Sequence, residues 1–128
     1  MGHDTVLTRE RDETVSIQQR ADLLNRERCD FVVSLHCNAA TNREASYVAT
    51  FVFSSQSKAA KLAGYIQDEL VRATGWPDGE IRERKFAILR RTVMPAVLAE
   101  MGFISNPAQE KLLAQPDFQK QLAQAIAA

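Results

Sequence analysis

Two nearly continuous apolar runs limit the folds open to this chain more than any other feature. The first covers residues 31–36 (FVVSLH) and the second covers residues 95–103 (PAVLAEMGF). Such runs are typical of central strands in a parallel sheet, because helices cover these strands on both faces. Each run also carries one ionisable side chain, His36 in the first and Glu100 in the second. The fold and the chemistry of the chain are therefore expected to meet in these two strands.

Shorter segments alternate between strand-like and helix-like patterns. Stretches rich in β-branched and aromatic or apolar residues predict further strands at 4–8, 47–53 and 86–89. Apolar residues at helical spacing predict helices after Ser16, over 57–74, after Asn106 and from Pro116 onward. Residues 75–80 (GWPDGE) are interpreted as a turn-rich loop. This alternation predicts an α/β fold: a mostly parallel, twisted sheet with helices on both faces, in a single domain over residues 1–128.

Composition narrows the class of protein. The 128 residues are enough for one domain with a core. The 16 basic and 16 acidic residues leave no net charge, which argues against binding nucleic acid through bulk positive charge. No apolar run approaches the roughly 18 residues that a membrane-spanning helix needs. The opening MGHDTVLTRERDE lacks the basic segment and apolar core of a signal peptide. We therefore expect neither a nucleic-acid partner, nor a membrane span, nor a signal peptide in this chain.

Strand geometry predicts where the candidate functional side chains point. Successive side chains on a strand face opposite ways, so Ser34, His36 and Asn38 share one face while Cys37 lies on the other. In parallel sheets, ligands bind beyond the carboxyl ends of the strands. Since His36 and Glu100 both lie near such ends, we expect them at the same edge of the sheet.

The residue types at this edge indicate hydrolytic chemistry. Histidine suits metal binding or proton transfer, and a carboxylate in an apolar run has a raised pKa that suits a general acid or base. Together His36 and Glu100 indicate a zinc hydrolase, although a catalytic zinc normally has three protein ligands and His36 is the one obvious ligand. Two simpler interpretations stay open. His36 could be a hydrogen-bonded structural residue, and Glu100 could form a buried ion pair with Arg90 or Arg91.

Longer motifs carry a resemblance to a known family. They are VLTRERD, VSIQQRADLLN, CDFVVSLHCNAA, FAILRRTVMPAVLAEMGFISNPAQEKLL and FQKQLAQAIA, in this order over essentially the whole chain. The chain thereby resembles the zinc-dependent N-acetylmuramoyl-L-alanine amidases of the amidase 3 family. The combination of SLHCNA with MPAVLAEMGFISN is specific to this resemblance. It implies a peptidoglycan hydrolase of the periplasm or cell exterior, which cleaves the amide between N-acetylmuramic acid and L-alanine of the stem peptide.

The resemblance also implies roles for single residues. His36 matches a zinc histidine, Glu100 matches the catalytic glutamate, and Asn38 matches an asparagine that supports the site. The family normally opens with a strand that ends in a Gly-His-Gly-Gly loop, followed by a glutamate at the start of a first helix. This chain begins after both, so we expect an N-terminally truncated domain, an incomplete Zn²⁺ ligand set, an unpaired strand edge and little or no amidase activity of the chain alone.

Other hypotheses remain open at this point. The chain could be an inactive module that binds peptidoglycan without cleaving it, or a cytosolic α/β protein whose Cys37 is a nucleophile beside His36. We expect Cys29 and Cys37 to be free thiols rather than a disulfide. The sequence leaves the oligomeric state open, although an exposed sheet edge favours association.

Overall fold

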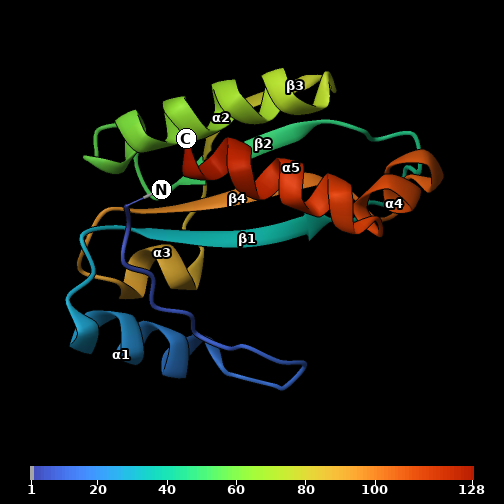
Figure 1. The fold of residues 1–128 in the computed structure, drawn as a ribbon. Coiled ribbons are helices and arrows are strands. Elements are labelled where there is room, and N and C mark those ends of the chain that lie inside the picture. Colours follow the sequence, from blue (N-terminus) through green and yellow to red (C-terminus); the bar gives the residue numbers. More distant parts are fainter. Residues whose placement is uncertain (1) are drawn as a thin grey trace.

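The structure, a computed structural model, describes residues 2–128 and contains one four-stranded sheet between two layers of helices (Figure 1). The strands lie in the order β1-β4-β2-β3, with bounds β1 Val32–Asn38, β2 Val48–Val52, β3 Asp78–Glu83 and β4 Ala96–Phe103. β1 runs parallel to β4 and β2 parallel to β3, whereas β2 and β4 are antiparallel. The sheet is therefore mixed but mostly parallel, and the prediction of an α/β domain is confirmed.

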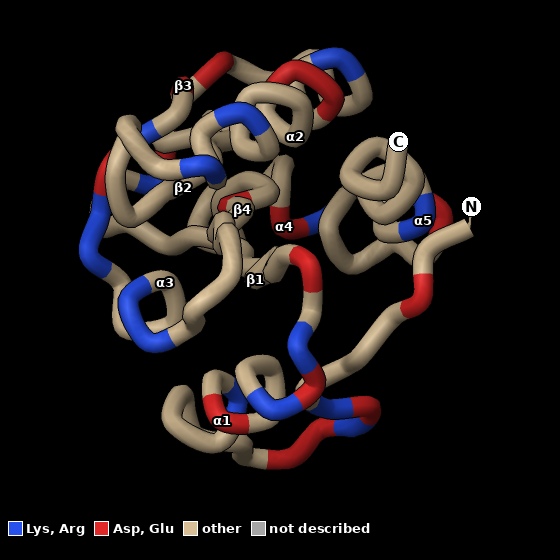
Figure 2. The backbone as a smooth tube through the Cα atoms, turned by 90° about the vertical axis from the view of Figure 1, so that its left-hand side faces the viewer, with Lys and Arg blue, Asp and Glu red and all other residues tan. Residues whose placement is uncertain are grey.

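Helices cover both faces of this sheet, as predicted. α2 (Ala59–Thr74) and α5 (Pro116–Ala127) lie on one face, and α1 (Ile17–Glu27) and α3 (Ala87–Arg91) lie on the other. The short α4 (Pro107–Leu113) links β4 to α5. Along the backbone, the positions of basic and acidic residues are scattered over helices and loops (Figure 2). None of the helices in the described part of the chain combines the length and apolar character needed to cross a membrane.

Each face of the sheet has its own apolar core. The core below α2 and α5 includes Val48, Val52, Ala63, Ile66, Leu70, Val97, Ala99 and Leu122. The core above α1 and α3 includes Ala21, Leu24, Val32, Phe51, Ile88, Leu89, Ala96 and Leu98. Burial of one such aliphatic side chain contributes about 1.5–3 kcal/mol. Because alternate residues of β4 enter opposite cores, Glu100 follows Ala96 and Leu98 onto the α1/α3 face.

The predicted helix starts at Ser16 and Asn106 are confirmed. The Ser16 hydroxyl accepts a hydrogen bond from the Gln19 amide at 3.1 Å, and the Gln19 side chain accepts one from the Ser16 amide at 2.9 Å. This reciprocal capping box satisfies amide groups that a helix N-terminus would leave without partners. Asn106 caps α4 with its side-chain oxygen, and Pro107 occupies the first helical position.

Two short segments differ from their predicted structure. The predicted strand at 86–89 is instead part of α3, in which the neighbours Ile88 and Leu89 are both buried. A strand would have turned them to opposite faces, and an apolar run this short does not distinguish helix from strand. The predicted loop at 75–80 contains the start of β3, because Asp78 pairs with Val48 of β2.

β1 is an edge strand: its apolar pattern alone predicted a central strand, whereas the resemblance predicted the unpaired edge that the structure has. Among the residues that the structure describes, it pairs with β4 alone. Apolar side chains are consequently exposed along it, with Leu35 at 56% and Phe31, just before the strand, at 46%. An unpaired edge with exposed apolar side chains was expected from the sequence.

The predicted strand at 4–8 is not formed. This segment is extended but has no ladder partner, and Val6 and Leu7 are 42% and 58% exposed. A strand is stable only beside another strand, and none lies next to this one. The Arg20 guanidinium of α1 instead holds the segment through a 3.2 Å hydrogen bond to the Thr8 hydroxyl.

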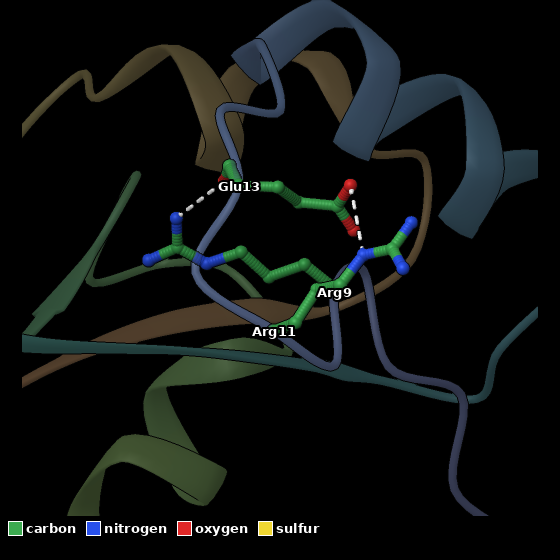
Figure 3. A network of polar contacts seen from close by, with 3 residues as sticks. All are labelled: Arg9, Arg11 and Glu13. Atoms are coloured by element: carbon green, nitrogen blue, oxygen red, sulfur yellow. Dashed lines mark hydrogen bonds and ion pairs between the residues drawn. The ribbon is translucent and has the colours of Figure 1, made fainter.

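A small polar network shapes the chain between this segment and α1 (Figure 3). Arg9 Nη1 donates to the Glu13 carbonyl at 2.9 Å, and Arg11 Nε lies 3.5 Å from Glu13 Oε2. These side chains are exposed, so the ion pair contributes at most about 1 kcal/mol. The network closes a loop locally without joining it to the sheet.

The first prediction concerns Gly102, which lies in β4 two residues after Glu100. Its φ is +109°, and an added Cβ would lie 2.6 Å from an indole carbon of Trp76. We expect Gly102→Ala to lower the free energy of unfolding by about 3 kcal/mol or more, through backbone strain plus overlap with the indole. Urea denaturation measures this loss.

Gly75→Ala is the matched control. Gly75 also has positive φ, +65°, but no atom lies within 4 Å of the added Cβ. Its loss should be limited to backbone strain of about 1–2 kcal/mol. Equal losses in the two variants would show that the close approach of Trp76 to β4 is not important for stability.

Candidate active site

Parallel pairing of β1 with β4 brings His36 and Glu100 together. The two residues are direct partners in the register of this strand pair, so their side chains project from the same face of the sheet. Both lie near the carboxyl ends of their strands, which end at Asn38 and Phe103. The sequence-based expectation that the imidazole and the carboxylate share one edge is therefore met in their placement.

His36 is exposed and is held by a neighbour on its own strand. Ser34 Oγ lies 2.9 Å from His36 Nε2, and this contact places the two side chains on one face as expected. Partial desolvation, and then the positive charge of Arg20, lower the pKa of His36. The imidazole is therefore neutral near pH 7, which is the form that binds metals or accepts a proton.

The carboxyl group of Glu100 has the most strongly shifted pKa in the site. Burial raises the pKa of its carboxyl group to about 7. Its Oε2 atom is buried and has no hydrogen-bond partner, and none of the ion pairs among residues 2–128 includes it. The alternative of an ion pair with Arg90 or Arg91 is therefore wrong. A buried carboxylate oxygen without a partner is costly in a purely structural role.

Asn38 lies at an irregular point of β1. The register with β4 shifts between His36 and Asn38, so that Asn38 is paired with Phe103. Its side-chain oxygen accepts a hydrogen bond from the Ala39 amide at 2.9 Å, and its carbonyl accepts one from the Ile104 amide at 2.8 Å. These contacts shape the chain just after His36, and a supporting role for Asn38 stays a prediction.

Cys37 points away from this pair, as predicted. It lines an apolar groove of about 300 Å³ between the β1 edge and α5, together with Leu35 and Met101. Burial, and then the charge of Glu100, raise the pKa of the Cys37 thiol. A thiol with a raised pKa stays protonated near neutral pH and is a poor nucleophile. Cys29 and Cys37 are both free thiols, as expected.

The described residues fit part of a zinc site but not a complete one. A catalytic zinc takes three protein ligands. Residues 2–128 hold no group of three His, Cys, Asp or Glu side chains that could share a metal ion. His3 lies toward the opposite end of β1, where its ring centroid is 6.5 Å from that of Phe31. The pair formed by His36 and Glu100 can therefore supply one metal ligand and one proton-transfer group.

Two neighbours of the pair were missed by sequence reasoning. Arg20 donates from Nε to the Val15 carbonyl at 3.0 Å, and its charge reaches His36. Arg20 directly precedes Ala21, one of the buried residues of α1, and this position was the sequence signal that could have indicated its proximity to the sheet. Ser105 accepts a hydrogen bond from the Ala40 amide at 3.0 Å, and no spacing in the sequence indicates this contact.

The second prediction follows from the carboxyl group of Glu100. Its pKa is raised from 4.5 to about 7, so the folded chain holds a proton that the unfolded chain releases in this range. The stability of the fold should therefore fall as pH rises through about 7. Relative to its effect at pH 5, we expect Glu100→Gln to raise the free energy of unfolding at pH 8 by about 1–2 kcal/mol, after allowing for solvent screening of a side chain that is only partly buried.

Urea denaturation of both proteins at pH 5 and pH 8, in a chelator, measures this difference. Glu110→Gln, at an exposed position of α4, is the matched control. An identical effect of Glu100→Gln at the two pH values would contradict the assignment of a buried, destabilised carboxylate.

Comparison with known proteins identifies the family of this fold and site. The amidase 3 family, described as N-acetylmuramoyl-L-alanine amidase, matches residues 1–128. The germination-specific N-acetylmuramoyl-L-alanine amidase of Bacillus subtilis is 30% identical over 120 residues, which cover 91% of this chain and 49% of that protein. The N-acetylmuramoyl-L-alanine amidase CwlM of Mycobacterium tuberculosis is 32% identical over 133 aligned positions, covering 100% of this chain and 33% of CwlM. The chain thus spans half or less of the length of these relatives.

A solved structure shows the same architecture. The catalytic domain of CwlV, an N-acetylmuramoyl-L-alanine amidase from Bacillus (Paenibacillus) polymyxa var. colistinus, superposes with a TM-score of 0.91 at 33% identity. The match covers 97% of this chain and 68% of that chain. The resemblance carried by the sequence motifs is thereby confirmed, and the chain belongs to the amidase 3 family of N-acetylmuramoyl-L-alanine amidases.

Proposed function

We propose that this chain takes part in hydrolysis of the amide between the lactyl group of N-acetylmuramic acid and L-alanine of the peptidoglycan stem peptide. Family membership supports the reaction class. The observation that carries the proposal is the direct pairing of His36 with Glu100, whose buried Oε2 has no partner. The cell wall is then the substrate, and the chain works in the periplasm or outside the cell.

Glu100 is the proton-transfer group in this proposal. Amide hydrolysis needs a base that removes a proton from water and an acid that returns one to the leaving nitrogen. A carboxyl group with a pKa of about 7 is populated in both forms near neutral pH. Glu100 takes the proton as the water oxygen bonds to the carbonyl carbon. It returns the proton to the alanine nitrogen as the carbon–nitrogen bond breaks, which leaves a lactyl carboxylic acid and a free amine; proton exchange between the two products then gives a carboxylate and an ammonium group.

His36 is proposed as one ligand of a zinc ion, with Asn38 shaping the chain beside it. Bound zinc would supply a Lewis acid that polarises the scissile carbonyl and lowers the pKa of water. The neutral imidazole and its contact with Ser34 support the role of His36. Since the described residues of one copy do not complete a ligand set, further ligands have to come from outside them.

One observation favours a second candidate function. The partial ligand set is also what an inactive module would have if it bound peptidoglycan without cleaving it. Zinc held through His36 with few other ligands binds weakly, because each missing ligand reduces affinity. Binding and cleavage therefore have to be measured separately.

The third prediction tests both candidates. The chain is incubated with a muropeptide and excess Zn²⁺, and mass spectrometry measures newly released N-terminal L-alanine peptides. We expect slow, zinc-dependent release, which Glu100→Gln lowers at least about 100-fold because it removes the proton carrier. The zinc content per chain is measured in the same experiment for the parent and for His36→Ala. We expect the His36→Ala variant to bind no zinc under conditions in which the parent binds it.

Pull-down with insoluble peptidoglycan completes the test, with Glu100→Gln again as the matched variant. Release that is unchanged in Glu100→Gln would contradict the role of Glu100. Retention on peptidoglycan without any release at saturating zinc would instead support the binding module.

A further inference from the structure

Hydrogen bonds join the chain just after β4 to the end of β1 and the loop that follows it, a few residues beyond His36 and Glu100. The Ile104 amide, just after β4, donates to the Asn38 carbonyl at 2.8 Å. The Ala40 amide, just after β1, donates to the Ser105 hydroxyl at 3.0 Å. Arg43 Nε donates to the Ser105 carbonyl at 3.3 Å. Ser105 therefore contacts the loop after β1 through both its side chain and its backbone.

These contacts lie where the ladder between β1 and β4 is irregular. His36 is opposite Glu100, but the register shifts before Asn38, which is opposite Phe103. From His36 to Asn38 β1 advances by two residues, while β4 advances by three from Glu100 to Phe103, so the extra residue lies on β4 and the ladder is locally disrupted there. The chain after His36 thus depends on bonds from outside the ladder, and Ser105 provides one from a side chain.

The far end of the same loop is anchored independently. Gln109 of α4 is 3% exposed, and its side-chain oxygen accepts a hydrogen bond from the Phe103 amide at 2.8 Å. Its side-chain nitrogen donates to the Ser46 carbonyl at 2.6 Å. Gln109 holds the end of the loop that leads into β2, and Ser105 holds the end that begins after Asn38.

We propose that Ser105 is a positioning residue, whose hydroxyl holds the chain after His36 where it passes the bulge of β4, and thereby keeps the imidazole alongside Glu100. Without the hydroxyl, the part-buried Ala40 amide loses its partner, and an amide left in this state favours movement of the loop toward water. The Arg43 contact does not compensate, because it binds the Ser105 carbonyl and not Ala40.

The fourth prediction compares Ser105→Ala with two matched variants. Ser105→Thr keeps the hydroxyl and should behave like the parent. Thr92→Val removes a different buried hydroxyl, which donates to the Ile88 carbonyl at 2.8 Å in α3, away from the loops joined by Ser105. All proteins are studied metal-free, at a temperature where each is folded.

Nuclear magnetic resonance provides readouts that do not need activity. We expect Ser105→Ala to speed hydrogen exchange of the Ala40 amide at least about tenfold and to shift the ring signals of His36. Thr92→Val should lower stability without either change. If Ser105→Ala lowers stability but leaves the His36 ring signals in place, Ser105 is only structural and the inference is wrong.

A further test, which rests on the proposed function, measures the kinetics of L-alanine peptide release. Where the parent releases L-alanine peptides, Ser105→Ala should lower kcat about tenfold with KM within twofold, because a displaced group costs rate more than binding. An unchanged kcat would overturn the inference. A parent without turnover would count against the proposed function alone, since the signals of His36 and Ala40 still decide the role of Ser105.

Discussion

The pairing of β1 with β4 is the interaction on which the site depends. It is a parallel ladder between residues far apart in the sequence, and it sets His36 directly opposite Glu100. β4 is held in turn by antiparallel pairing with β2 and by apolar side chains that enter both cores. The stability of the fold therefore offsets the cost of a half-buried carboxylate with an unpaired oxygen, a cost that a surface position would not impose.

Much of this arrangement could be predicted from the sequence because it rests on local patterns. The apolar runs, the capping residues Ser16 and Asn106, and the period of two along a strand are enough to place His36 and Glu100 at one edge. A prediction that needed knowledge of neighbouring strands was wrong: the segment at 4–8 is not a strand, because none of the described strands lies beside it. The composition of β1 is that of a central strand, and only the resemblance predicted its unpaired edge.

The contacts that surround the pair could not be predicted for a related reason. Ser105 meets Ala40, and Arg20 approaches His36, through the paths of loops and the position of α1, which have no periodicity. The raised pKa of Glu100 was predictable in direction from its apolar run. The absence of an arginine partner among the described residues was not, since Arg90 and Arg91 are close in sequence but lie at the end of α3.

The long separation of His36 from Glu100 along the chain also bears on how the molecule reaches its folded state. Contacts between distant segments close large loops and form late, after helices and local turns are in place. The pairing of β1 with β4 closes a loop that contains β2, α2, β3 and α3. The two side chains therefore come together only once this long-range pairing has formed, and a nascent or partly unfolded chain lacks the assembled pair.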